Sequence, residues 1–153
     1  MVRVNQVWIG DLETDGLLDE ATTIWCGCYL SYPRRDIKTF DPSSITDMIQ
    51  WMKGKCLVFH NASGFDIPVI KKLYNYEHPH YLDSLKMSQM MYPDIKGYKS
   101  PHSIEAWGER FGRHKPEHED WSKYTPEMLH RCKEDTEIGW LLYNKIIRER
   151  GGK

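Results

Sequence analysis

Four acidic residues in three separated segments are the residues of this sequence best suited to chemistry. They are Asp11 and Glu13 in DLETDG, Asp66 in HNASGFD and Asp135 in HRCKEDT. Each segment is expected at the end of a strand or the start of a helix, where a fold can bring distant carboxylates together. Clustered carboxylates repel one another unless cations lie between them, and such oxygen ligands suit Mg²⁺ or Mn²⁺. The chemistry indicated is metal-assisted cleavage of a phosphodiester.

The first acidic pair follows an apolar run, residues 7–10, that is expected to be a buried strand. Two acids beside a buried strand are rarely ordinary surface charge. A separation of two residues also places Asp11 and Glu13 on the same face of an extended strand. One metal ion could therefore contact both carboxylates.

The second segment places Asp66 after a short apolar strand, in the first turn of a helix expected over residues 66–74. A carboxylate in this position can also serve only to complement the helix dipole. The register of Asn61 and Phe65 with Asp66, together with the first motif, favours the chemical interpretation.

Together the three segments resemble the DEDD, or DnaQ-like, 3′-to-5′ exonucleases. The motifs of that family are D-x-E-T-x-G, N-x-x-x-F-D, and either H-x-x-x-x-D or Y-x-x-x-D, and all three occur here in order. His130 stands five residues before Asp135, whereas Arg131 holds the position of the alternative tyrosine. The sequence therefore resembles the histidine branch, DEDDh. Because five residues of an ideal helix separate two side chains by roughly 140°, His130 is expected in an irregular first turn.

Three stretches, HNASGFDIPVI, LDSLKMSQMMYP and HSIEAWGERFG, resemble the amino-terminal proofreading domain of family A phage DNA polymerases. In that domain the third motif has the tyrosine spacing, whereas the third motif of this sequence has the histidine spacing. The resemblance implies an α/β, ribonuclease H-like fold: a mixed five-stranded sheet with helices on both faces. It also leads us to expect a single exonuclease domain over residues 1–153, phage-encoded, with a separate DNA polymerase as a candidate partner.

The resemblance implies specific roles for nine residues. Four carboxylates would hold two Mg²⁺ or Mn²⁺ ions, namely Asp11, Glu13, Asp66 and Asp135. Four residues would contact the substrate strand, namely Thr14, Leu17, Asn61 and Phe65, with Leu17 as a wedge beside the terminal base. His130 would accept the proton of the attacking water. The implied reaction releases nucleoside 5′-monophosphates from single-stranded or frayed DNA 3′ ends.

Two other functions remain open at this point. An exoribonuclease that prefers RNA would differ only through a contact to the 2′-hydroxyl group, which a sequence does not reveal. A catalytically inactive module that binds 3′ ends is the other alternative. The presence of four acids together with His130 argues against it, because a module without chemistry has no physical reason to keep carboxylates that repel one another.

Composition fits an enzyme of this kind. The 153 residues have a formal net charge of −1, which would become +3 without the four proposed ligands, since each carries one negative charge. No apolar run is long enough to span a bilayer and no signal peptide is evident, so a cytoplasmic setting is expected. The four cysteines lack C-x-x-C spacing and are expected to be reduced residues of the core.

Hydrophobic periodicity predicts strands over residues 4–11, 22–31, 37–40 and 56–59, with a short fifth strand over 80–83. Helices are predicted over residues 44–52, 66–74, 84–91, 103–111 and 126–150. Trp107 and Trp140 have the spacing of packed residues, although Trp107 could instead stack on a base.

Overall fold

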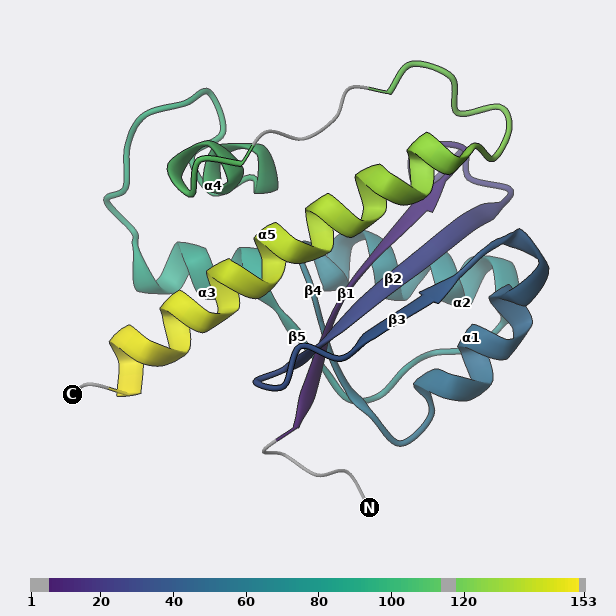
Figure 1. The fold of residues 1–153 in the computed structure, drawn as a ribbon, viewed down its shortest axis with the longest axis horizontal. Helices are drawn as coiled ribbons and strands as arrows, with labels where there is room; N and C mark the ends of the chain where they lie inside the picture. The colour runs from purple at the N-terminus through teal and green to yellow at the C-terminus, as the bar shows by residue number, and fades with distance from the viewer. Residues whose placement is uncertain (1–5, 114–117, 152–153) are drawn as a thin grey trace.

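The computed structural model describes residues 6–113 and 118–151 (Figure 1). Its centre is one five-stranded sheet in the order β3-β2-β1-β4-β5. The strands are β1 (Val7–Thr14), β2 (Ile24–Tyr32), β3 (Ile37–Phe40), β4 (Cys56–Phe59) and β5 (Tyr81–Asp83). The first three strands pair antiparallel, whereas β4 runs parallel to β1 and β5 runs parallel to β4. The predicted mixed sheet is confirmed.

Within the described residues, seven helical segments connect or cover these strands. They are the 3₁₀ turn η1 (Pro42–Ser44), α1 (Ile45–Met52), the π-helical turn η2 (Ala62–Asp66), α2 (Ile67–Tyr74), α3 (Ser84–Met91), α4 (Ile104–Arg110) and α5 (Pro126–Gly151). The predicted helices are all present, with boundaries that differ by at most one residue; Ser44 and Asp66 belong instead to η1 and η2. No helix within the described ranges has both the length and the apolar character needed to cross a membrane.

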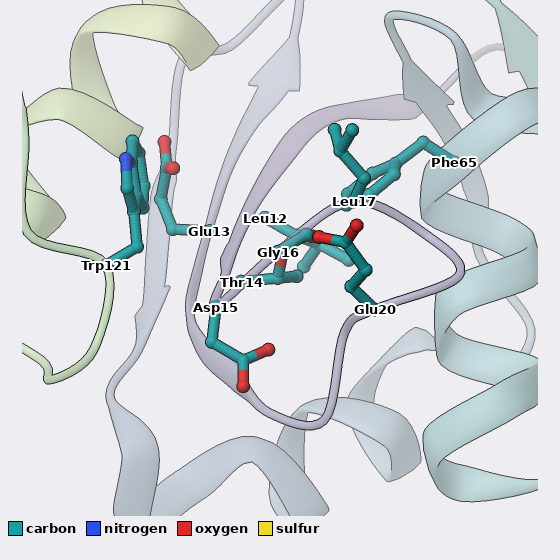
Figure 2. Close-up of a pocket in the computed structure, with 9 residues that line it drawn as sticks. All are labelled: Leu12, Glu13, Thr14, Asp15, Gly16, Leu17, Glu20, Phe65 and Trp121. Atoms are coloured by element: carbon teal, nitrogen blue, oxygen red, sulfur yellow. The ribbon is translucent and has the colours of Figure 1, made fainter.

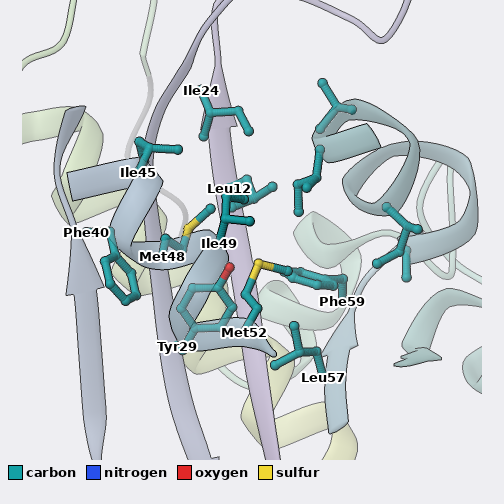
Figure 3. Close-up of a cluster of buried hydrophobic side chains, with 14 of the residues drawn as sticks. Leu12, Ile24, Tyr29, Phe40, Ile45, Met48, Ile49, Met52, Leu57 and Phe59 are labelled. Atoms are coloured by element: carbon teal, nitrogen blue, oxygen red, sulfur yellow. The ribbon is translucent and has the colours of Figure 1, made fainter. Parts of the chain in front are cut away.

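One face of the sheet is covered by α1 and α2 (Figure 3). The apolar sides of these helices pack on Leu12, Tyr29 and Phe59 of the strands. The regular spacing of apolar residues along α1 produces this contact, because Ile45, Met48, Ile49 and Met52 lie on one side of the helix. This layer supports the sheet from the side opposite to the proposed chemistry.

The other face is covered by the long helix α5, which crosses β1 and β2 (Figure 1), with α3 and α4 packed beside it. Ile9 of β1 lies in the same buried cluster as Tyr143 of α5. A Cβ atom added at Gly139 would come within 3.1 Å of the Ile9 side chain, so this glycine permits the close approach of α5 to β1. The close approach brings residues of α5 near the acidic residues of β1.

Two predictions about single residues are decided by burial. Trp107 is only 1% exposed, so it packs in the core and is not available to stack on a base. The indole N–H of Trp107 donates to Ser88 Oγ at 2.9 Å. The four cysteines are free thiols, three of them fully buried, as expected.

Candidate active site

Asp11 and Glu13 lie on the face of β1 that α5 covers. Side chains alternate along a strand, so the two acids share this face with Ile9, which packs in the buried cluster beneath α5. The predicted strand over residues 4–11 would place this pair at its end. The observed strand continues to Thr14, so both acids lie within β1. One oxygen of each carboxylate and the Cys132 Sγ lie within 4.8 Å of one another. The alternation therefore produces the shared face that the sequence predicted.

Cys132 of α5 is the third member of this cluster and was missed by the sequence analysis. Its thiol donates to the backbone carbonyl of Asp11 at 3.3 Å. Burial is the largest cause that raises the pKa of this thiol well above its usual value, followed by a hydrogen bond with Cys26 and the charge of Asp11. Cys132 therefore stays a neutral thiol that joins α5 to β1, and the charged donors of the cluster are carboxylate oxygens.

Asp66 closes the π-helical turn η2, and α2 begins at the next residue. The predicted α-helix over 66–74 is therefore wrong at its first residue. The Asp66 side chain is buried, and burial is the largest cause that raises the pKa of its carboxyl group well above the usual range. A backbone hydrogen bond opposes this rise, while the charges of Asp83 and Glu13 add to it. Asp66 thus lies close enough to Glu13 for the two charges to repel.

Asp83, at the end of β5, supports the turn that carries Asp66. Its carboxylate accepts hydrogen bonds from the backbone N–H groups of Asn61, Ser63 and Leu85 at 3.0 to 3.1 Å, and from Ser63 Oγ at 2.9 Å. Burial alone would raise the pKa of Asp83, but these hydrogen bonds hold it below its usual value. The sequence analysis did not single out Asp83, although it stands in the LDSLK stretch quoted for the family resemblance.

Asn61 begins the same turn in the left-handed conformation, with φ of 70°. A Cβ atom at Gly64 would lie 2.4 Å from Asn61 Oδ1, so the glycine leaves room for the Asn61 side chain over the turn. Asn61 is exposed to solvent and is not among the residues that line the pocket beside Glu13.

The third acidic segment lies in α5. Asp135 is buried on this helix, which is regular from Pro126 onward, so the irregular first turn expected around His130 is wrong. His130 is exposed, and five residues of regular helix turn it roughly 140° away from Asp135. Arg131 stands four residues before Asp135 and therefore shares its side of the helix. Its Nε lies 4.0 Å from Glu13 Oε1, with only 16% of the side chain exposed.

A pocket of about 430 Å³ opens beside Glu13 (Figure 2). Thr14, Leu17 and Phe65, three of the four predicted substrate-binding residues, line it together with Trp121. Leu17 is 74% exposed, an unusual position for a leucine that has no contact to make. The structure therefore brings these three residues to the edge of the acidic cluster.

Trp121 was missed because it lies in a charged stretch without hydrophobic periodicity. Its backbone carbonyl accepts a hydrogen bond from Trp25 Nε1 at 2.9 Å, which ties this segment to β2. The guanidinium carbon of Arg131 lies 5.2 Å from the centre of the Trp121 ring. The sequence did offer one signal for Trp121, because it is an aromatic residue within six residues of the predicted start of the last helix.

The donor set fits a hard divalent cation. Asp11 and Glu13 offer carboxylate oxygens at close range, and Asp66 is a buried acid whose ionisation is opposed by the charge of Glu13. Oxygen ligands of this type are those that Mg²⁺ and Mn²⁺ prefer. A cation between the carboxylates would remove the repulsion that the pKa of Asp66 reveals.

Comparison with known proteins identifies the superfamily of this chain. A family model of the RNase_H superfamily matches residues 9–124, which is most of the chain. The chain therefore belongs to the RNase_H superfamily.

The curated relatives include the DNA-directed DNA polymerase of Escherichia phage T7, which is 22% identical over 187 residues. The alignment covers 93% of this chain and 27% of the polymerase, so the chain spans about a quarter of that relative's length.

Two solved structures share the fold. The family B DNA polymerase of Pyrobaculum calidifontis superposes with a TM-score of 0.70 at 13% identity, covering 95% of this chain and 25% of the polymerase chain. Exonuclease I of E. coli, in complex with a dT13 oligonucleotide, gives a TM-score of 0.68 at 9% identity, covering 94% of this chain and 41% of its own. The predicted ribonuclease H-like fold is confirmed. The resemblance to the DnaQ-like exonucleases is confirmed at the level of family and fold, and the histidine subclass stays a prediction.

Proposed function

We propose that this protein is a metal-dependent 3′-to-5′ exonuclease that removes nucleoside 5′-monophosphates from single-stranded or frayed DNA 3′ ends. One observation carries the proposal. The pocket lined by Thr14, Leu17 and Phe65 also includes Glu13, so a space suited to a terminal nucleotide opens directly beside the acidic cluster. Its volume of about 430 Å³ lies in the range of small-ligand sites.

In this proposal Asp11, Glu13, Asp66 and Asp135 hold two Mg²⁺ or Mn²⁺ ions. Such a pair of bound cations supplies activation of the attacking water and neutralisation of charge on the leaving 3′ oxygen. Asp83 contributes indirectly, because its hydrogen bonds to Asn61 and Ser63 fix the turn that ends in Asp66.

His130 is the proposed acceptor for the proton of the attacking water. It is the histidine of the segment 126–135, and histidine is the side chain that most often acts as a general base. Its place on the exposed side of α5, next to Arg131, would let it meet water at the rim of the site. Arg131 cannot fill this role, because an arginine does not give up its proton in a protein.

The terminal nucleotide would lie in the pocket, with Leu17 beside its base and Phe65 and Trp121 offering aromatic surface. Stacking on aromatic side chains is worth about 1–3 kcal/mol per base and tolerates any sequence. Asn61, exposed at the start of the π-helical turn, would contact the strand further from its 3′ end. The dT13 complex of E. coli exonuclease I supports a single-stranded DNA substrate.

The test is digestion of three matched oligonucleotides that carry a 5′ label: single-stranded DNA, a primer-template with a mismatched 3′ end, and RNA. We expect a ladder of products shortened from the 3′ end with Mg²⁺ and none with EDTA. A matched set with a 3′ label should release labelled mononucleotide at once. Faster digestion of RNA than of DNA would show that the exoribonuclease alternative is correct. Tight binding of 3′ ends without any cleavage in Mg²⁺ or Mn²⁺ would show an inactive module.

We propose further that the enzyme edits for a separate DNA polymerase in the cytoplasm of a phage host. The similarity to the DNA-directed DNA polymerase of phage T7 motivates this idea. The measurement is the excision rate of a 3′ mismatch with and without the cognate polymerase. A rate that the polymerase does not change counts against editing in trans.

A further inference from the structure

Arg131 holds the position where a tyrosine subclass of the family would have its tyrosine, yet its chemistry is different. A guanidinium group is permanently charged and presents a planar fork of donors that matches a phosphate group. Its Nε lies 4.0 Å from Glu13 Oε1, and 84% of the side chain is covered by protein. Such a largely covered cation beside the reacting centre needs a role.

The guanidinium group also lies over Trp121, at 5.2 Å from the ring centre. Glu13 and Trp121 are both among the residues that line the nucleotide pocket, so Arg131, which is not itself a lining residue, lies next to two residues that are. Stacking on an aromatic ring restricts the guanidinium group and keeps its donors directed to one place. Arg131 is therefore held beside two residues of the pocket lining, one of which, Glu13, belongs to the acidic cluster.

Arg131 can exchange its contact with Glu13 for a contact with a bound phosphate group. Glu13 is a proposed metal ligand, and a carboxylate that binds a divalent cation has less negative charge to offer an arginine. A phosphate group bound beside Glu13 would then offer the guanidinium group a fully charged acceptor. We propose that Arg131 binds the phosphate group of the terminal nucleotide, which is the phosphate that the reaction cleaves. This inference rests on the proposed function, and it adds a phosphate-binding residue to the site.

The test compares the binding of dTMP, the expected type of product, with that of thymidine, which lacks the phosphate group. Isothermal titration in Mg²⁺ measures both affinities without turnover. Arg131→Gln should weaken dTMP binding by about 10- to 100-fold, the range for hydrogen bonds to a charged group, and leave thymidine binding within about twofold. Arg131→Met, which keeps apolar contact with Trp121, should lose dTMP binding to the same extent.

Lys133→Gln is the matched control. It removes the same charge from α5, but Lys133 is exposed and lies two residues further, about 200° around the helix. It should bind dTMP as the wild type does. If the wild type binds dTMP and both Arg131 variants bind it equally well, or if dTMP and thymidine lose affinity together, the phosphate assignment is wrong and the proposed function stands. If the wild type itself binds no dTMP in Mg²⁺, the proposed function fails with it.

Discussion

Asp66 and Asp83 lie at opposite ends of one small region, the π-helical turn η2 and the end of β5, and they behave in opposite ways. Both are buried acids, yet burial raises the pKa of Asp66 well above its usual range, while hydrogen bonds lower the pKa of Asp83 against the effect of burial. The Asp83 carboxylate accepts hydrogen bonds from three backbone N–H groups and from one hydroxyl group. The pKa of Asp66 is instead raised further by the charges of Asp83 and Glu13.

The difference separates a structural carboxylate from a functional one. An ionised group stabilised by several hydrogen bonds contributes to folding and needs nothing else. A buried acid beside other acids is held at a cost that a bound cation can offset. Perturbed acids of the second kind gather at functional sites. The comparison therefore favours Asp66 over Asp83 as a proposed metal ligand.

The largest expected effect comes from removing the two acids of β1. Asp11→Ala combined with Glu13→Ala should lower the rate of cleavage by about 10³-fold or more, because the cluster loses two of its proposed ligands. The fold should be at least as stable without metal, since two clustered negative charges are removed. Cleavage assays at saturating Mg²⁺ and thermal melting in EDTA measure the two effects. Near wild-type turnover would falsify the proposed site.

His130 provides the next largest test, on the helix side of the site. His130→Ala should lower kcat by about 10²-fold, the size expected for a lost general base. Metal affinity should hardly change, because His130 is assigned to the water. Arg131→Ala should mainly weaken nucleotide binding. A full rate for His130→Ala at neutral pH, or a greater loss of kcat in Arg131→Ala, means that the spacing to Asp135 is a coincidence.

Asp83→Asn tests the structural half of the comparison. Three backbone donors would lose a charged acceptor, so the variant should be less stable at pH 7 by about 1–3 kcal/mol. The folded pKa of Asp83 is lowered from 3.8, so its contribution is present above that pH and is lost as the pH falls through the folded value. Urea unfolding at pH 7 and below pH 3.8 should show the gap to wild type closing in acid. Asp19→Asn, an exposed acid, is the control and should change stability little. A gap that does not depend on pH excludes the ionised acceptor as the cause.

Asp66→Asn should have the opposite sign in the metal-free protein. The folded pKa of Asp66 is raised, so stability is lost as the pH rises from the unfolded value near 3.8 towards the folded value, because the acid ionises in the unfolded chain before it does so in the fold. An asparagine cannot ionise, so the metal-free variant should be more stable than the wild type at pH 7. Unfolding in EDTA at pH 5 and pH 7 measures this gain. The added stability from Mg²⁺ should shrink in the variant, and a less stable variant in EDTA would contradict the assignment.

The sequence by itself determined the features that depend on local periodicity. The two-residue step between Asp11 and Glu13 fixes their shared face, and the apolar patterns locate the strands and helices to within two or three residues. The predicted first residue of α5 is correct, and the predicted last residue differs from the observed one by a single residue. Such features follow from the repeat of one strand or one helix, which a reader of the sequence can count.

Tertiary structure decided the features that depend on contacts between distant segments. The rotation of α5 about its own axis, set by Cys132 packing on β1, directs Arg131 to Glu13 and leaves His130 exposed. The link from Asp83 to Asn61 spans 22 residues, and Trp121 reaches the pocket only because its segment is tied to Trp25. No local pattern encodes such distances, because each depends on how all the elements pack together. The residues that line the site could therefore be named in part from motifs, but their partners could not.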